Sequence, residues 1–174
     1  NNQNQDISRL TSCLAYSIFD RMGVPASRCN FAKMTVNDSA MGIYANVEPI
    51  KKPMLRRHFT DDSGNLYEGT VADLRTGFTS RIEKKTNEEE NNWQDIDELV
   101  AAIEAPDDVF VEKISAVLDL DAYIRFAIAE AMIGHWDGFN GNTNNYYFYN
   151  NPANNKFYFL PWGPDGTFNY DQGA

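Results

Sequence analysis

The first regular pattern of the chain is amphipathic, with apolar residues recurring at helical spacing after a polar start. Asp6 precedes this pattern as a candidate N-cap, and Gly23 stands where a glycine commonly ends a helix. The pattern therefore predicts a helix over 7–22. The positions that set its spacing are Ile7, Leu10, Leu14, Ile18 and Met22.

After the first helix, apolar and polar residues alternate and β-branched residues recur. This pattern predicts two strands, 29–36 and 41–47, and the turn residues between them join the strands as a pair. Glu48-Pro49 ends the second strand. Residues 51–69 are mostly polar and predict a connecting segment.

Helical periodicity returns in the second half of the chain. It predicts helices over 93–104, 107–118 and 121–133, the last ended by Gly134 and capped by Asp119 or Asp121. Two aromatic strands, 145–149 and 156–160, then predict a hairpin. These elements indicate one domain of the α+β class. The residues expected to face inward from the last helix are Tyr123, Ile124, Ala127, Ile128 and Ile133.

At 174 residues, 43% of them apolar, the chain is long enough for one domain with a real core. Its formal charge of −10 argues against nucleic acid as the main partner, because phosphate backbones recruit Lys and Arg. No apolar run is long enough to span a bilayer. The polar start without Met and the end just after 161–166 predict a piece truncated at both ends.

Two smaller features leave alternatives open. Cys13 and Cys29 pair if the first helix packs beside the strand that follows it, and otherwise remain buried free thiols. A positive patch in 51–57 is better explained by a solvated helix face or loop than by a phosphate or substrate contact, and His58 beside it has no evident partner. The cations of this patch are Lys51, Lys52, Arg56 and Arg57.

Candidate chemistry is concentrated between the last predicted helix and the end of the hairpin. In protein kinases a catalytic-loop Asp accepts the proton of the acceptor hydroxyl, and an Asn five residues later binds metal. Asp137 and Asn142 have this spacing, and Asp165 follows the hairpin as a second metal-binding Asp does in kinases. The order of helix, loop, hairpin and Asp favours a phosphotransfer site.

Five segments occur in an order that resembles the CotH family of spore-coat and surface proteins. They are LAYSIFDRMGVPA, NDSAMGIYANVEPI, HFTDDSGNLYEG, GNTNNYYFY and FLPWGPDGTF. The resemblance covers essentially the whole chain. It implies a partial atypical protein-kinase-like fold, with 1–50 as a remnant of the N-lobe and hinge and 51–174 as part of the C-lobe.

The resemblance also implies site residues. Asp137 matches the family's catalytic aspartate, and Asn145, before the aromatic strand, matches its metal-binding asparagine better than Asn142 does. The family's closing motif is Pro-Trp-Asp-x-Asp, whose first Asp binds metal; Gly163 stands there in this chain, and Asp165 keeps the second acid. Glu48 corresponds to the segment between the lobes where adenine would lie, with its backbone expected to matter more than its side chain.

The implied function is transfer of the ATP γ-phosphate to Ser or Thr hydroxyls of proteins, with Mg²⁺ or Mn²⁺, at a cell or spore surface. Loss of a metal ligand at Gly163 implies weakened or absent activity. A glycine-rich loop and a strand Lys are missing ahead of the first helix, and 7–22 contains no Glu. The main alternative is a surface adhesion or coat protein that uses the same fold without catalysis.

Several of these residues also fit a purely structural role. Asp137 could cap its loop, the asparagines could serve as turn formers, and His135 is expected to be packed rather than catalytic. A glycan hydrolase that uses Asp137 and Asp165 as its carboxylate pair is a third possible function.

Overall fold

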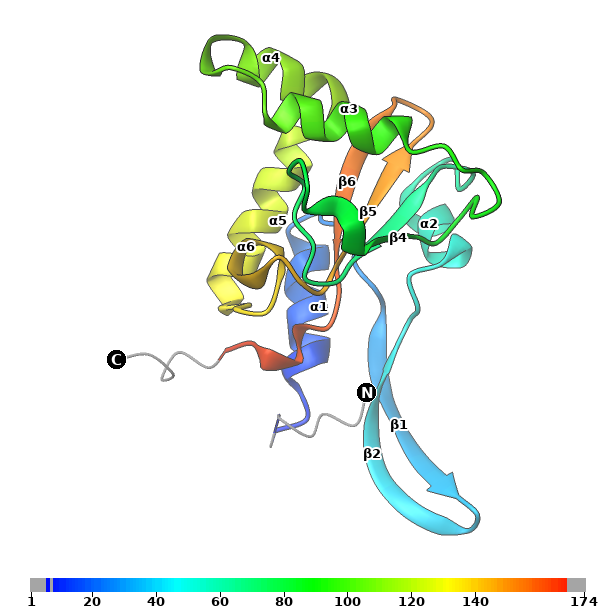
Figure 1. Ribbon diagram of the computed structural model, residues 1–174. Helices are drawn as coiled ribbons and strands as arrows, with labels where there is room; N and C mark the ends of the chain where they lie inside the picture. The colour runs from blue at the N-terminus through cyan, green and yellow to red at the C-terminus, as the bar shows by residue number, and fades with distance from the viewer. Residues whose placement is uncertain (1–5, 7, 169–174) are drawn as a thin grey trace.

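The computed structural model describes residue 6 and residues 8–168 of the chain. Its mixture of helices and antiparallel strands confirms the predicted α+β class (Figure 1). The elements, where η marks a 3₁₀ turn, are α1 (Thr11–Arg21), β1 (Cys29–Val36), β2 (Ser39–Val47), α2 (Lys52–His58), β3 (Leu66–Gly69), η1 (Thr79–Arg81), β4 (Ile82–Lys84), α3 (Gln94–Ile103), α4 (Asp107–Val117), α5 (Leu120–Ile133), α6 (Phe139–Asn142), β5 (Tyr146–Asn151), β6 (Lys156–Pro161) and η2 (Pro164–Gly166).

The larger sheet has the strand order β4-β3-β5-β6, with all neighbours antiparallel. The predicted aromatic hairpin is confirmed as β5 and β6. The prediction that 51–69 is only a connection was wrong, because this segment contains both α2 and β3. β3 has four residues, too few to show a periodicity, and it is stabilised by pairing with β5 far along the chain.

The smaller sheet is a two-stranded ribbon, β1–β2, that extends away from the rest of the molecule in Figure 1. Its pairing runs from Cys29↔Val47 to Val36↔Ser39, with an irregularity between Met34 and Thr35. The two strands confirm the predicted pair. Most of the ribbon is exposed, so its base is the part that contributes to the core.

Aromatic rings fill the space between the larger sheet and the helices α1 and α5. The ring of Phe126 on α5 lies 5.9 Å from that of Phe19 on α1 and 5.5 Å from that of Phe159 on β6. Tyr146 lies over Gly69, where a Cβ atom would come within 2.1 Å of the tyrosine ring. Position 69 therefore requires glycine to let β5 approach β3.

Helix α5 was predicted with nearly the right bounds, but its buried face was predicted only in part, since Ile133 is buried and Tyr123 packs against the core as expected. The Asp119 side chain caps it and Gly134 ends it in the left-handed conformation, as expected. Ile124 and Ile128 are 51% and 46% exposed instead of inward, because apolar residues lie on both sides of this helix and periodicity alone does not define its buried face. The residues that do face the core are Ala122, Phe126, Ala129, Glu130 and Ile133.

Helix α1 begins later than the sequence predicts. The N-cap position of α1 is Leu10 rather than Asp6, although the Asp6 carboxylate accepts a hydrogen bond from the backbone N–H of Thr11 at 2.8 Å. Ile7 lies outside the described residues. Cys13 of α1 and Cys29 of β1 form a disulfide, which decides between pairing and free thiols for these two residues. None of the helices in 8–168 is long and apolar enough to cross a membrane.

Candidate active site

The end of α5 directs the chain into the loop that carries Asp137. Gly134 adopts a φ of 61°, and the next backbone N–H, that of His135, donates to the carbonyl of Glu130 at 2.9 Å. The His135 ring is buried, with Nε2 3.3 Å from the carbonyl oxygen of Trp162. Burial lowers the pKa of His135, so the neutral ring packs between the loop and the end of β6.

Three asparagine side chains surround the carboxylate of Asp137. Asn142 Nδ2 donates to Oδ1 at 2.8 Å, and Asn144 Nδ2 donates to the same oxygen at 3.2 Å. Asn145 Nδ2 donates to Oδ2 at 2.7 Å and to the Asp137 carbonyl at 2.9 Å. No Lys or Arg in the described part of the chain pairs with this carboxylate. The structure thus brings Asp137, Asn142 and Asn145 together around a negative charge held by neutral donors.

Glu130, a buried carboxylate of α5, anchors the same loop. Its Oε1 accepts from the N–H of Phe139 at 3.1 Å, and its Oε2 accepts from the N–H and the Nδ2 of Asn140 at 3.0 and 2.6 Å. Burial raises the pKa of Glu130, and the hydrogen bonds from Asn140 and Phe139 oppose this rise. A Cβ atom at Gly138 would lie 2.3 Å from Oε1, so glycine is required for this close approach.

Glu130 is a site residue that the sequence patterns did not predict. The signal that could have found it is a single carboxylate in the last turns of an otherwise apolar helix. Such a group is seldom buried without hydrogen-bond donors around it, and the segment near enough in sequence to supply them is the loop after Gly134.

The turn after β6 closes over the loop. The N–H of Trp162 donates to the carbonyl of Asn145 at 3.2 Å. Gly163 follows with a φ of 55°, and a Cβ atom there would lie 2.9 Å from Asn145 Oδ1. Both its backbone conformation and the space beside it therefore favour glycine at the position where the resemblance expects an acid.

Asp165 lies in η2, near the asparagine cluster but outside its hydrogen bonds. It makes no hydrogen bond or ion pair with the described residues, yet its charge acts on two buried rings. Burial raises the pKa of Tyr16; a hydrogen bond with the Gly163 backbone opposes the rise, and Asp165 adds to it. Asp165 also opposes the lowering of the His135 pKa. It is thus a neighbouring charge rather than part of the hydrogen-bonded cluster.

A cavity of about 290 Å³ adjoins this turn and is lined by residues of both α1 and β2. Its walls combine aromatic, aliphatic and polar groups. Because Gly163 lines the cavity and also approaches Asn145, the cavity and the Asp137 cluster lie next to one another. The residues that line it are Ser12, Tyr16, Ala45, Asn46, Val47, Trp162, Gly163 and Pro164.

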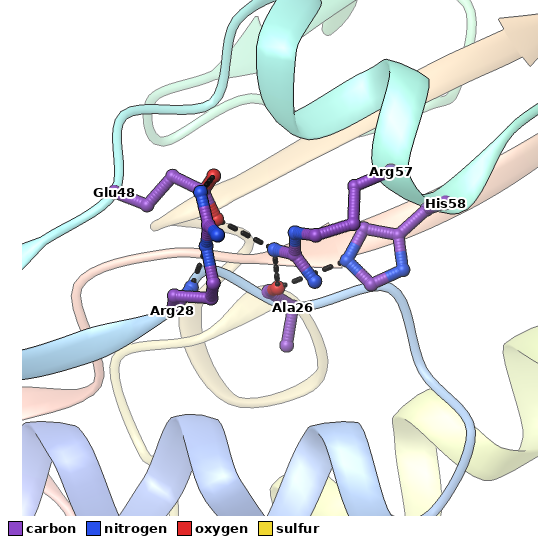
Figure 2. A network of polar contacts seen from close by, with 5 residues as sticks. All are labelled: Ala26, Arg28, Glu48, Arg57 and His58. Carbon is purple, nitrogen blue, oxygen red and sulfur yellow. Dashed lines mark hydrogen bonds and ion pairs between the residues drawn. The ribbon is translucent and has the colours of Figure 1, made fainter.

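Glu48, at the end of β2, is held by two arginines (Figure 2). Arg28 Nη2 donates to Oε1 at 2.7 Å, Arg57 Nη2 donates to Oε2 at 2.5 Å, and the N–H of Glu48 itself donates to the Arg28 carbonyl at 2.8 Å. Arg57 Nη2 and His58 Nε2 both lie within hydrogen-bonding distance of the Ala26 carbonyl, at 2.9 and 3.0 Å. The network joins α2 to the base of the ribbon, where Arg28 precedes β1 and Glu48 follows β2. The adenine role of Glu48 stays a prediction.

The positive patch is exposed on and beside α2, as the prediction of a solvated helix face or loop allows. Arg57 in addition binds Glu48 and the Ala26 carbonyl, and His58, which had no evident partner in the sequence, lies within hydrogen-bonding distance of the same carbonyl. Arg56 pairs with Asp62 at 2.7 Å.

The Asp137 cluster offers oxygen ligands for a divalent cation. Among the described residues, no group of three or more His, Cys, Asp or Glu side chains could hold a metal ion. With their Nδ2 groups directed at Asp137, Asn142 and Asn145 have amide oxygens left for another partner. Carboxylate and amide oxygens are ligand types that Mg²⁺ and Mn²⁺ accept, and Asp165 is the neighbouring acid. Beside Asn145 Oδ1 the turn packs closely, because a Cβ atom at Gly163 would lie only 2.9 Å away.

Comparison with known proteins identifies the family. The model of the CotH kinase protein family matches residues 1–174. The chain belongs to the CotH kinase family. This membership confirms the resemblance found in the sequence, and a kinase-like fold is implied through the CotH family.

Individual CotH relatives are distant in sequence and longer than this chain. Inner spore coat protein H of Bacillus subtilis (strain 168) is 24% identical over 182 residues, which cover 98% of this chain and 49% of that protein. Invasin CotH3 of Rhizopus delemar is 25% identical over 187 residues, covering 98% of this chain and 31% of the invasin. Spore coat protein homolog 1 of Rhizopus delemar is 24% identical over 175 residues, covering 94% and 29%. The chain spans about half or less of the length of these relatives.

Proposed function

We propose that this chain is the phosphotransfer part of a CotH-type atypical protein kinase, which moves the γ-phosphate of ATP to Ser or Thr hydroxyls of proteins. The observation that carries the proposal is the Asp137 carboxylate, held by three neutral amides beside the cavity between α1 and β2. Phosphoryl transfer requires little else from a protein than a base aimed at the acceptor and oxygen ligands for a metal.

Each residue of the cluster has a distinct role in phosphotransfer. Asp137 accepts the proton of the acceptor hydroxyl, and the amides of Asn142 and Asn145 fix the orientation of its carboxylate. The oxygens of Asn142, Asn145 and Asp165 would hold the divalent cation, which would supply charge neutralisation on the phosphates. With Gly163 in place of an acid, the closing turn contributes one carboxylate, and we expect a slow enzyme.

A surface location is part of the proposal. The names of the relatives refer to spore coat proteins and invasins. The disulfide between Cys13 and Cys29 supports the same location, since disulfides persist in oxidising compartments and at cell surfaces. The acceptor is then expected to be a coat or surface protein.

The test is transfer of labelled γ-phosphate from ATP by the full-length protein with Mg²⁺ or Mn²⁺. Asp137→Ala should reduce the rate by roughly 100-fold or more. Asp121→Ala, which removes an exposed carboxylate from the first turn of α5, should keep the wild-type rate. Equal rates for Asp137→Ala and the wild type would contradict the proposed role of Asp137.

A second function is favoured by Gly163 and by the names of the relatives: a non-catalytic adhesion or coat module with the same fold. Calorimetry with ATP and Mg²⁺ or Mn²⁺ separates the two. A kinase should bind the nucleotide in a metal-dependent way. A module that serves only adhesion should show no such binding.

A further inference from the structure

Asn144 differs from the other two asparagines that bind Asp137, because its amide oxygen already has a donor. Its Nδ2 donates to Asp137 Oδ1 at 3.2 Å, and its Oδ1 accepts from the backbone N–H of Val71 at 3.1 Å. The amide oxygens of Asn142 and Asn145 accept no hydrogen bond from the described residues. Asn144 therefore connects Asp137 to a segment that lies 73 positions earlier in the chain.

The segment that meets Asn144 is Val71-Ala72, shortly after the end of β3, and two further hydrogen bonds attach it to the Asp137 loop. The N–H of Ala72 donates to the carbonyl of Thr143 at 3.0 Å. The hydroxyl of the buried Tyr146 donates to the carbonyl of Ala72 at 2.8 Å. Because these contacts come from residues on both sides of Asn144, the position of the Val71 N–H is fixed relative to the Asn144 side chain.

The backbone is strained where the two segments meet. Val71 has a φ of 48° and Thr143 a φ of 47°, and both residues are β-branched. Such residues rarely adopt the left-handed conformation, and they keep it only where surrounding contacts hold them there. The contact between the Val71-Ala72 segment and the loop, rather than local preference, thus sets the backbone at both positions.

The Val71 N–H leaves the Asn144 amide one orientation. A backbone N–H can only donate, so it requires the amide oxygen of Asn144. The NH₂ group then points toward Asp137, whose carboxylate can only accept. A flipped amide would place NH₂ against the N–H of Val71 and oxygen against the carboxylate, so both hydrogen bonds would be lost.

We infer that Asn144 is a positioning residue for Asp137: the Val71-Ala72 segment fixes the Asn144 amide, and the amide fixes the direction of the carboxylate that accepts the proton. This inference rests on the proposed function. It separates the tasks of the asparagines, since Asn142 and Asn145 keep amide oxygens for the cation and Asn144 does not. A small change in the direction of a reacting group costs rate without weakening the binding of a nucleotide.

The test measures kcat and the KM for ATP by transfer of labelled γ-phosphate, with the full-length protein and Mg²⁺ or Mn²⁺. Asn144→Ala should lower kcat by roughly tenfold or more, the value of one hydrogen bond to a charged group, and change the KM by less than about twofold. Asn91→Ala, which removes an exposed amide between β4 and α3, should leave both constants unchanged.

A double variant shows whether Asn144 acts through Asp137. In the Asp137→Ala protein there is no carboxylate to orient, so adding Asn144→Ala should change the residual rate by less than about twofold. A role of Asn144 in the general stability of the loop would instead lower the rate in both backgrounds. The Tm of each variant, measured by thermal unfolding, ensures that the rates are compared on folded protein.

Three results would overturn the inference. The first is equal kcat for Asn144→Ala and the wild type. The second is a raised KM for ATP with unchanged kcat, which would assign Asn144 to binding. The third is a similar further loss when Asn144→Ala is added to Asp137→Ala. In each case the proposed function stands as long as Asp137→Ala itself is slow; if Asp137→Ala is as fast as the wild type, the inference and the proposed role of Asp137 fail together.

Discussion

Two carboxylates of this molecule are each held by several donors, and the charge of the donors differs. Glu48 is bound by the guanidinium groups of Arg28 and Arg57. Asp137 is bound by three neutral amides. Guanidinium groups neutralise the carboxylate that they bind, whereas amides orient it and leave its charge. The comparison indicates that Glu48 has a structural role. At Asp137 the carboxylate keeps its negative charge, which can then interact with a proton or a cation.

The largest expected contrast is in phosphotransfer. Asp137→Asn preserves the size of the side chain and removes the charge, so the rate should fall by roughly 100-fold or more. Glu48→Gln should change the rate less than about threefold, because its charge is already neutralised by Arg28 and Arg57. Labelled-ATP transfer measures both. A loss of similar size in the two variants would remove the distinction between them.

Replacement of Glu130, which anchors the loop that carries Asp137, should give the next largest effect. Glu130→Gln places an NH₂ group where an oxygen accepts from the loop, so the free energy of unfolding should fall by about 2–3 kcal/mol. Glu112→Gln, at an exposed position of α4, should change it by less than about 0.5 kcal/mol. Urea unfolding measures both, and equal stability of the two variants would contradict the anchoring role.

Replacement of Gly163 in the closing turn by alanine should destabilise the protein more than the same replacement of Gly77. Gly163 and Gly77 both have positive φ, but a Cβ atom at Gly163 meets Asn145 while one at Gly77 meets nothing within 4 Å. Gly77→Ala should therefore lose about 1 kcal/mol for backbone strain alone, and Gly163→Ala up to about 2 kcal/mol. Thermal unfolding of the pair checks this. A smaller loss at Gly163 would show that the turn moves away from Asn145 easily.

The smallest effect concerns the stability of the Glu48 network in acid. Burial pushes the pKa of Glu48 up, but hydrogen bonds from Arg28 and Arg57 and the charge of Arg57 lower it from 4.5 to about 2. Because the folded-state pKa is the lower one, the network stabilises the fold above pH 4.5 and loses this contribution as pH falls toward about 2. Glu48→Gln should remove about 1 kcal/mol at neutral pH, after screening by solvent and salt, and nothing near pH 2. Urea unfolding across this range measures the difference.

Local patterns predicted the elements that depend on local chemistry. The aromatic alternation of 145–160, the cap and terminal glycine of α5, and the spacing of Asp137 and Asn142 can all be recognised within short windows. These elements are confirmed, and the loop brings Asp137 and Asn142 together.

Features that depend on distant partners could not be predicted in this way. β3 exists because Leu66 and its neighbours pair with Tyr149 and its neighbours, about eighty positions later. The partner of Arg57 is fixed by α2, and that of Glu130 by the path of the loop. The exposed side of α5 carries Ile124 and Ile128, which only the packing of the whole domain distinguishes from its buried side.

The disulfide has a consequence for how the cavity is assembled. Cys13 follows Ser12 on one wall, and Cys29 pairs with Val47, which lies on the other. The bond closes a loop across a sequence separation of 16, and its reduction would return about 3 kcal/mol of chain entropy to the unfolded state. A reducing environment would thus remove the covalent link between α1 and the ribbon. The redox state of the surroundings therefore affects the stability of the contact between α1 and β2, which line the cavity.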